Sequence, residues 1–201
     1  PTRRSSDLHQ YVKQYRRLVL KAPWSSSGRG IRFIDGELNS YHTGWLRNLI
    51  ERQGCVMVEP YYRKIKDFGM EFYRHKNGII SYEGLSLFHT SNGAYTGTVL
   101  MTESAKRAYI GQYVALDLLD HVCDIIANNL SLKHYCGSFG VDMMIVAQND
   151  DEGFLLHPCV EINLRRTMGH VALAVSPDSD DVKKVMRIQL TDNYKLKINK
   201  L

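Results

Sequence analysis

Long apolar segments and clustered cysteines are both missing from this sequence of 201 residues. Because no run of 18 apolar residues occurs, we expect no membrane-spanning helix. The four cysteines lie far apart without CxxC spacing, which argues against a zinc site or a disulfide framework. We therefore favour buried reduced thiols in a cytoplasmic protein, and no signal peptide is recognisable.

Long runs of basic residues are absent as well. The chain has 26 Lys and Arg against 21 Asp and Glu, a net charge of +5, and no run of five or more basic residues. This mild excess suits anionic substrates such as nucleotides, and its scatter argues against a nucleic-acid partner. The apolar fraction of 44% is ordinary for a globular protein of one domain or two small subdomains.

The first eight residues, PTRRSSDL, resemble a translated sequencing adapter. We expect residues 1–8 to be an artefact outside the fold, and part of the natural sequence to be missing before them. The alternative is a genuine serine-rich terminus.

Residues 135–170 contain the stretch that is richest in chemistry. Val141 to Val146 reads as an apolar strand, residues 148–153 as a polar turn, and Phe154 to Ile162 as the returning strand. The sequence therefore predicts a hairpin.

Three oxygen-bearing side chains of this hairpin are expected to meet. Alternate residues of a strand share a face, so a pairing of Asp142 with the region of Glu161 would also bring Asn163 close. Carboxylates within apolar strands are costly unless their charge is compensated. Mg²⁺, which binds one or two carboxylates plus phosphate oxygens, would compensate it. The alternative is that these are ordinary polar residues at strand ends.

A second candidate site follows the short strand that ends at Lys21. Residues 23–30, PWSSSGRG, form a loop with many free backbone N–H groups, which together with the lysine suits phosphate. The Walker A pattern GxxxxGK[ST] is absent, and a plain surface turn is the alternative.

The remaining pattern alternates short strands with a few helices. We predict helices at residues 41–53 (ended by Gly54), 110–130 (with caps offered before it at residues 102–104) and 167–174. Strands are predicted at 55–58, 68–75, 79–88, 95–101, 185–190 and 194–198. The helix at 110–130 is expected to present one apolar face made of Val114, Leu118, Val122, Ile125 and Ile126. Antiparallel strands with helices beside them indicate the α+β class.

The order of these strands, loops and helices along the chain resembles that of the ATP-grasp family over about residues 17–175. The motifs are LVLKAP with its Ser/Gly loop, VMVEPYY, FGMEF, and an aspartate strand followed by VEINLRR. The resemblance implies two α+β subdomains with antiparallel sheets that grip a nucleotide. A partial small subdomain would span residues 9–60 and a large one 61–201, and an N-terminal domain would be missing.

The resemblance also implies roles for individual residues. Lys21 would contact nucleotide phosphate, and Arg165 would steady the transferred group. The loop that closes over the phosphates would contain Ser25, Ser26, Ser27, Gly28 and Gly30. The linker that reads adenine would contain Glu59, Pro60, Tyr61 and Tyr62. Glu71 would hold the ribose, and the magnesium ligands would be Asp142, Glu161 and Asn163.

The implied function is that of a Mg-ATP-dependent ligase. It would join a carboxylate to an amine or thiol through an acyl phosphate, although this chain alone is expected to be incomplete. A nucleotide-binding regulatory module and kinase-like phosphoryl transfer are the alternatives. Gly140 departs from relatives that have an arginine two residues before the first acidic metal ligand. His157 and His170 are interpreted as structural residues.

Overall fold

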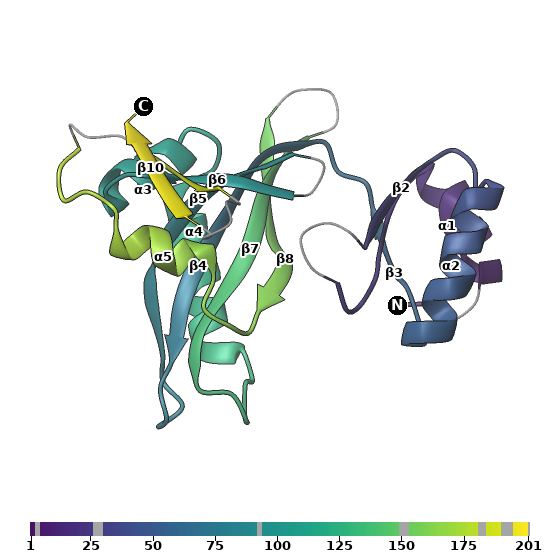
Figure 1. Ribbon diagram of the computed structural model, residues 1–201, viewed down its shortest axis with the longest axis horizontal. Helices are drawn as coiled ribbons and strands as arrows, with labels where there is room; N and C mark the ends of the chain where they lie inside the picture. The colour runs from purple at the N-terminus through teal and green to yellow at the C-terminus, as the bar shows by residue number, and fades with distance from the viewer. Residues whose placement is uncertain are drawn as a thin grey trace. The chain divides into compact units, whose positions relative to one another are not determined.

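The computed structural model describes residues 1–2, 5–25, 30–91, 94–148, 153–180, 184–189 and 195–200 (Figure 1). It divides into two compact units, Pro1–Tyr62 with Ser91–Ala94, and Arg63–Thr90 with Tyr95–Leu201. The main segment of the first unit ends at Tyr62, whereas the sequence-based boundary lies at residue 60. Both units combine helices with antiparallel strand pairs, so the predicted α+β class is confirmed.

The first unit packs two helices on a three-stranded sheet of order β2-β1-β3. Its elements are α1 (Ser5–Tyr15), β1 (Arg17–Lys21), β2 (Ile31–Asp35), α2 (Ser40–Gln53) and β3 (Met57–Pro60). Leu18, Leu20 and Ile34 face a core that also buries Leu8. The expectation that residues 1–8 lie outside the fold is therefore wrong, because α1 begins at Ser5 and Leu8 is fully buried. Their interpretation as a translated adapter stays a prediction.

Helix α2 begins and ends where the sequence indicates. The side chain of Asn39 accepts a hydrogen bond from the backbone N–H of His42, and the ring of His42 completes a capping box. Gly54 ends the helix in the left-handed conformation, with a φ of +81°.

The second unit contains a seven-stranded sheet of order β10-β9-β6-β5-β4-β7-β8. Its strands are β4 (Lys64–Arg74), β5 (Ile80–Ser91), β6 (Ala94–Leu100), β7 (Gly137–Ala147), β8 (Phe154–Asn163), β9 (Lys184–Gln189) and β10 (Lys195–Lys200). Its helices are α3 (Glu103–Ile110), α4 (Leu116–Asn129) and α5 (Met168–Ala174). The predicted meander, hairpin 141–162 and C-terminal hairpin are therefore present.

One face of this sheet forms the main apolar core with α3 and α4. Phe68, Phe72 and Phe139 are fully buried there, and the last two rings stack with centroids 5.2 Å apart. Helix α5 belongs instead to a separate small cluster with Leu100 and Met186.

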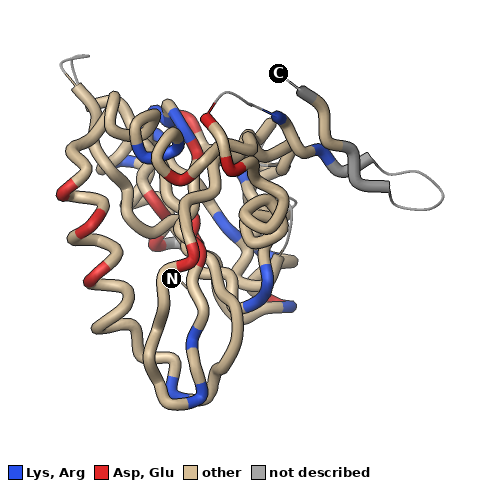
Figure 2. The backbone as a smooth tube through the Cα atoms, turned by 90° about the vertical axis from the view of Figure 1, so that its left-hand side faces the viewer, with Lys and Arg blue, Asp and Glu red and all other residues tan. Residues whose placement is uncertain are grey.

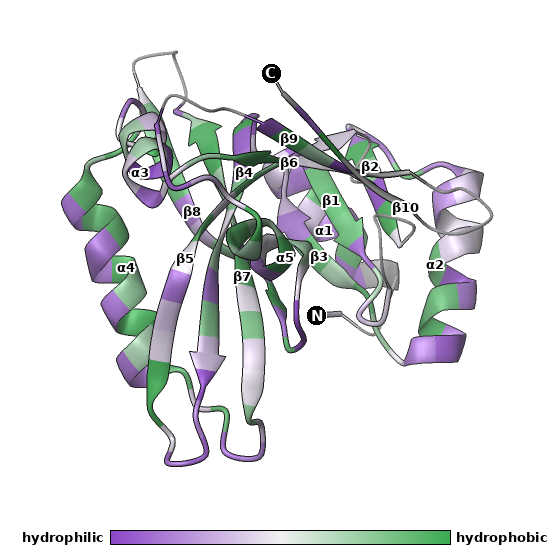
Figure 3. Cartoon of the chain, turned by 60° about the vertical axis from the view of Figure 1, so that its left-hand side comes forward, coloured by the Kyte–Doolittle hydropathy of each residue, from purple (hydrophilic) through white to green (hydrophobic). Residues whose placement is uncertain are grey.

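The predicted cap at residues 102–104 is present, since Thr102 caps α3, but the prediction of one continuous helix from there to residue 130 is wrong. The structure has two helices, because Gly111 ends α3 and the extended backbone of Ala115 restarts the helical phase at α4. Leu118 and Ile125, predicted to be buried, are 41% and 46% exposed, and the buried residues of α4 are Leu119 and Val122. Figure 3 shows the resulting alternation of hydrophobic and hydrophilic bands along α4.

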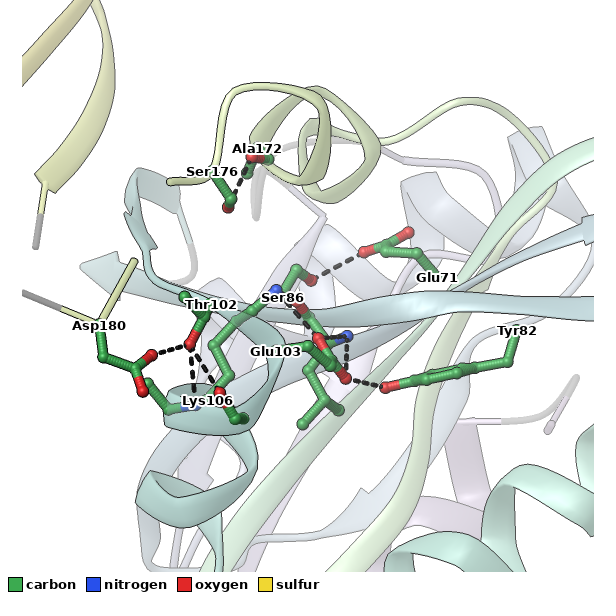
Figure 4. A network of polar contacts seen from close by, with 12 residues as sticks. Glu71, Tyr82, Ser86, Thr102, Glu103, Lys106, Ala172, Ser176 and Asp180 are labelled. Carbon is green, nitrogen blue, oxygen red and sulfur yellow. Dashed lines mark hydrogen bonds and ion pairs between the residues drawn. The ribbon is translucent and has the colours of Figure 1, made fainter. Parts of the chain in front are cut away.

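A partly buried polar network joins α3 to β5, which bulges opposite β4 (Figure 4). Glu103 accepts hydrogen bonds from the Leu85 backbone N–H at 3.0 Å and from the Tyr82 hydroxyl at 2.6 Å. Lys106 donates to the Leu85 carbonyl at 2.7 Å and pairs with Glu103 at 3.1 Å. The network thus satisfies both the backbone N–H and the carbonyl of Leu85 with side chains of α3.

Basic and acidic residues are interspersed along the chain (Figure 2). No helix within the described ranges has the length and apolar content needed to cross a membrane.

Candidate functional site

The β7–β8 register brings together the three side chains that the hairpin pattern singled out. Asp142 lies opposite Glu161, and Gly140 lies opposite Asn163. The side-chain amide of Asn163 donates to Asp142 Oδ2 at 3.0 Å. The pairing anticipated from the sequence is therefore present, and the metal role of these residues stays a prediction.

These residues belong to two adjacent rows that run across the sheet. One row, from β5 to β8, consists of Ser86, Gly69, Asp142 and Glu161, and the next consists of Gly84, Glu71, Gly140 and Asn163. Because successive residues of a strand alternate in direction, both rows lie on the face opposite the phenylalanine core. We call this face the polar face.

Asp142 carries a charge that its neighbours do not neutralise. Burial, followed by repulsion from Glu161 and Glu71, raises the pKa of Asp142 from 3.8 to about 7. The hydrogen bond from Asn163 and the positive charge of Arg165 offset this only in part. A cation at this position would remove the penalty.

Asn163 links Asp142 to Arg165. Asn163 is buried, and its Oδ1 accepts a hydrogen bond at 2.8 Å from the guanidinium of Arg165, which is itself exposed. The carboxylates of Asp142 and Glu161 can take a cation as they stand. The amide oxygen of Asn163 becomes a ligand only if Arg165 shares or releases it.

The residues present fit magnesium better than a metal held entirely by protein. In the described ranges, no group of three or more His, Cys, Asp or Glu side chains is arranged to hold a metal. Two carboxylates and an amide are hard oxygen donors, a set that Mg²⁺ completes with phosphate oxygens and water. The uncompensated charge of Asp142 agrees with such a site.

Glu71 lies on the same face but is closed off from solvent. It is 2% exposed, and its carboxylate accepts hydrogen bonds at 2.7 Å from the hydroxyls of Ser86 and Thr167. Nδ1 of His170 lies 3.0 Å from Glu71 Oε2. Both carboxylate oxygens are thus engaged by protein groups, and the predicted ribose role of Glu71 would require these bonds to be exchanged.

His170 is a hydrogen-bonded buried residue, as expected from the sequence. Its Nε2 lies 3.2 Å from the carbonyl oxygen of Phe72. Burial alone would lower the pKa of His170, but its hydrogen bond to Glu71 and the charge of that residue outweigh burial, so the pKa is raised.

Asp67 is a residue of the polar face that the sequence analysis missed. It lies four residues before Glu71 on β4 and opposite Met144 on β7. Its carboxylate pairs with Lys64 Nζ at 2.6 Å and accepts from the Thr90 hydroxyl at 2.5 Å. The even spacing between Asp67 and Glu71 is the signal that could have found it.

In the first unit, the predicted phosphate lysine and the first linker residue lie on one face of the small sheet. Lys21 Nζ lies 2.6 Å from a carboxylate oxygen of Glu59, across the β1–β3 pair. On the same face, Phe33 is 55% exposed and its ring meets that of Tyr61 edge to face. The guanidinium of Arg17 lies 4.0 Å from the Tyr61 ring centroid.

The predicted loop is only partly described. Ser26, Ser27 and Gly28 lie outside the described residues, whereas Ser25 and Gly30 lie within them. A hydrogen bond of 2.8 Å from the Ala22 N–H to the Gly30 carbonyl closes the base of the loop.

At the end of β3, one backbone N–H of the predicted linker is already used within the protein. Pro60 is the last residue of the strand, and the backbone N–H of Tyr61 donates to the Arg17 carbonyl at 3.0 Å. Tyr62 follows as the last residue of the unit's main segment. The adenine-reading role of these residues stays a prediction.

Comparison with solved structures decides the fold, although no protein-family model and no curated protein matches the sequence. The N5-carboxyaminoimidazole synthetase of Staphylococcus aureus complexed with ADP matches 94% of this chain with a TM-score of 0.58 and 17% identity. The biotin carboxylase domain of the Hydrogenobacter thermophilus 2-oxoglutarate carboxylase, in complex with MgADP, ADP and bicarbonate, matches 92% with a TM-score of 0.58 and 16% identity. The Campylobacter jejuni biotin carboxylase in a β-γ-ATP complex matches 88% with a TM-score of 0.54 and 13% identity.

The chain has the ATP-grasp fold. It covers 51%, 44% and 43% of these three ATP-grasp chains, which is about half of their length. The nucleotides belong to those structures, and at this identity the likeness establishes the fold alone.

At Gly140, which the sequence analysis singled out, the structure gives a physical reason for glycine. A Cβ atom at Gly140 would lie 2.6 Å from Glu71 Oε2 and 2.8 Å from the methyl group of Thr167. A side chain at this position would therefore require Glu71 or Thr167 to shift.

Proposed function

We propose that this ATP-grasp chain is the nucleotide-binding part of a Mg-ATP-dependent ligase that joins a carboxylate to an amine or thiol. The observation that carries the proposal is the uncompensated carboxylate of Asp142 beside Glu161 and Asn163. A magnesium ion bound there would neutralise the charge of the nucleotide phosphates and of the γ-phosphoryl group in transfer.

In this reaction, a carboxylate oxygen of the substrate attacks the γ-phosphorus and ADP leaves. The amine or thiol then attacks the acyl carbon and releases phosphate. Arg165 is exposed and tethered to Asn163, so its charge can stabilise the transferring group beside the metal ligands. Lys21, held by Glu59, would contact nucleotide phosphate.

Of the two carboxylates that β4 presents on the polar face, Asp67 is better suited than Glu71 to hold the ribose. Asp67 pairs with the partly exposed Lys64, whereas Glu71 is fully enclosed by three protein donors. We therefore expect Asp67→Ala to weaken nucleotide binding more specifically than Glu71→Ala.

Calorimetric titration of ADP with and without Mg²⁺ tests the proposal. Glu161→Ala and Asp142→Ala should abolish the gain in affinity that Mg²⁺ provides, because each removes a ligand. Asp124→Ala is a matched control, since it removes an exposed carboxylate from α4. Unchanged Mg²⁺ dependence in both ligand variants would contradict the metal site.

A second assay addresses the reaction. The complete protein should release ADP when carboxylates and amines are supplied together, and release should stop in Glu161→Ala. If Mg-ADP binds normally and no pair of substrates releases ADP, the regulatory-module alternative replaces the ligase.

A further inference from the structure

The carboxylate of Glu71 occupies a space that three glycines leave open. Cβ atoms added to Gly169, Gly140 and Gly69 would lie 1.8, 2.6 and 3.3 Å from its oxygens. For comparison, a Cβ atom added to Gly44, in helix α2, would meet no other atom within 4 Å. The absence of side chains around Glu71 is therefore what lets β4, β7 and α5 approach one another there.

The hydrogen-bond donors that fill this space come from two sides. Ser86 belongs to β5, whereas Thr167 and His170 belong to the start of α5. Thr167 and His170 also form the capping box of α5, so the groups that begin this helix are the groups that hold Glu71. We call Glu71, Ser86, Thr167 and His170 the Glu71 cluster.

The cluster holds one end of the segment that carries Arg165. At the other end, Asn163 is paired with Gly140 in the β7–β8 ladder. Residues 164–166 lie between these two anchors and are exposed. The Thr167 hydroxyl, bound to Glu71 at 2.7 Å, is thus the anchor on the C-terminal side.

We propose that Glu71 is a positioning residue, which through Thr167 and His170 fixes segment 164–166 and so holds the Arg165 guanidinium at Asn163. This rests on the proposed function, since the value of an ordered Arg165 lies in its charge beside the metal ligands. Ordering this side chain before the nucleotide arrives lowers the conformational cost of binding.

Thr167→Val is the sharpest test, because it removes the hydroxyl and nearly preserves the shape of the side chain. Loss of the charge-assisted hydrogen bond to Glu71 should free segment 164–166, and trypsin cleavage after Arg165 should become at least about tenfold faster. Mg-ADP affinity should fall about tenfold, because the charge of Arg165 is then no longer held beside the metal ligands. Thr167→Ser retains the hydroxyl and should restore both properties.

Thr102→Val is the matched control. Thr102 caps α3 as Thr167 caps α5, since its hydroxyl accepts a hydrogen bond from the Ala105 N–H. This variant should lose comparable thermal stability and leave cleavage after Arg165 and Mg-ADP affinity unchanged. Equal changes in the two variants would overturn the proposal, because a general loss of a helix cap would then explain them.

Gly140→Ala approaches the same cluster from β7 and should reproduce both effects of Thr167→Val. Wild-type rates of cleavage in Thr167→Val and Gly140→Ala would overturn the positioning role. If the wild-type protein does not bind Mg-ADP, the proposed function fails, whereas the cleavage pattern still decides whether Glu71 fixes the segment.

Discussion

Alternate residues of β4 and β7 face opposite sides of the sheet, and the two sides differ in chemistry. Phe68, Phe72 and Val141 fill a closed apolar core, whereas Asp67, Glu71 and Asp142 place carboxylates on the other side. The first side stabilises the fold by burial, and the second costs stability wherever a charge has no partner. A strand with apolar side chains on one face and carboxylates on the other can hold those carboxylates in place, because the buried face keeps its backbone rigid.

The apolar side should give the largest loss of stability. Phe72→Ala removes a fully buried ring stacked on Phe139, and we expect the free energy of unfolding to fall by about 3–5 kcal/mol. Its neighbour Tyr73 points the other way and is 37% exposed, so Tyr73→Ala should cost about 1 kcal/mol. Urea unfolding of both variants measures the contrast, and equal losses would contradict it.

On the polar side, Asp142→Asn should stabilise the metal-free protein. The pKa of Asp142 is about 7 in the folded chain against an ordinary 3.8, so its stability contribution falls as pH rises between these values and stays low above pH 7. At about 1.4 kcal/mol per pKa unit, the variant should gain roughly 2–4 kcal/mol at pH 8 and nothing at pH 3.5.

Thermal unfolding across this pH range measures that gain. Mg²⁺ should raise the unfolding temperature of the wild-type protein and not that of Asp142→Asn, because the amide supplies no negative charge. A variant less stable than the wild-type protein at pH 8 would show that the Asp142 carboxylate is already compensated.

The smallest effect is expected at Asp67, where the polar side does supply a cation. Lys64→Met removes an ammonium group that is 41% exposed and 2.6 Å from Asp67, so the loss should not exceed about 1 kcal/mol. The loss should shrink further in 1 M salt, which screens exposed pairs. A loss of several kcal/mol, insensitive to salt, would mean that this side is enclosed like the core.

Much of the second unit could be predicted because its signals are local. The pair Asn77-Gly78, between the strands predicted at 68–75 and 79–88, is a typical hairpin-turn sequence, and Gly78 has a φ of +91°. Alternating residues predicted both strands of the 141–162 hairpin and which side chains share a face. The prediction of one helix through residues 110–130 failed because five residues between α3 and α4 are not helical. The spacing of apolar residues does not reveal such a break, because it is similar on both sides of it.

By itself, the sequence determined which residues alternate, where the turns fall and that Asp142, Glu161 and Asn163 come together, because a strand's period and a tight hairpin follow from neighbouring residues. Only the tertiary structure decided that Glu71 is enclosed. Its partner Thr167 lies 96 residues further along the chain, and the space between them exists because Gly140 and Gly169, on separate elements, lack side chains. Packing between distant elements, which no local pattern encodes, separates the enclosed carboxylate Glu71 from the metal-ligand candidate Asp142.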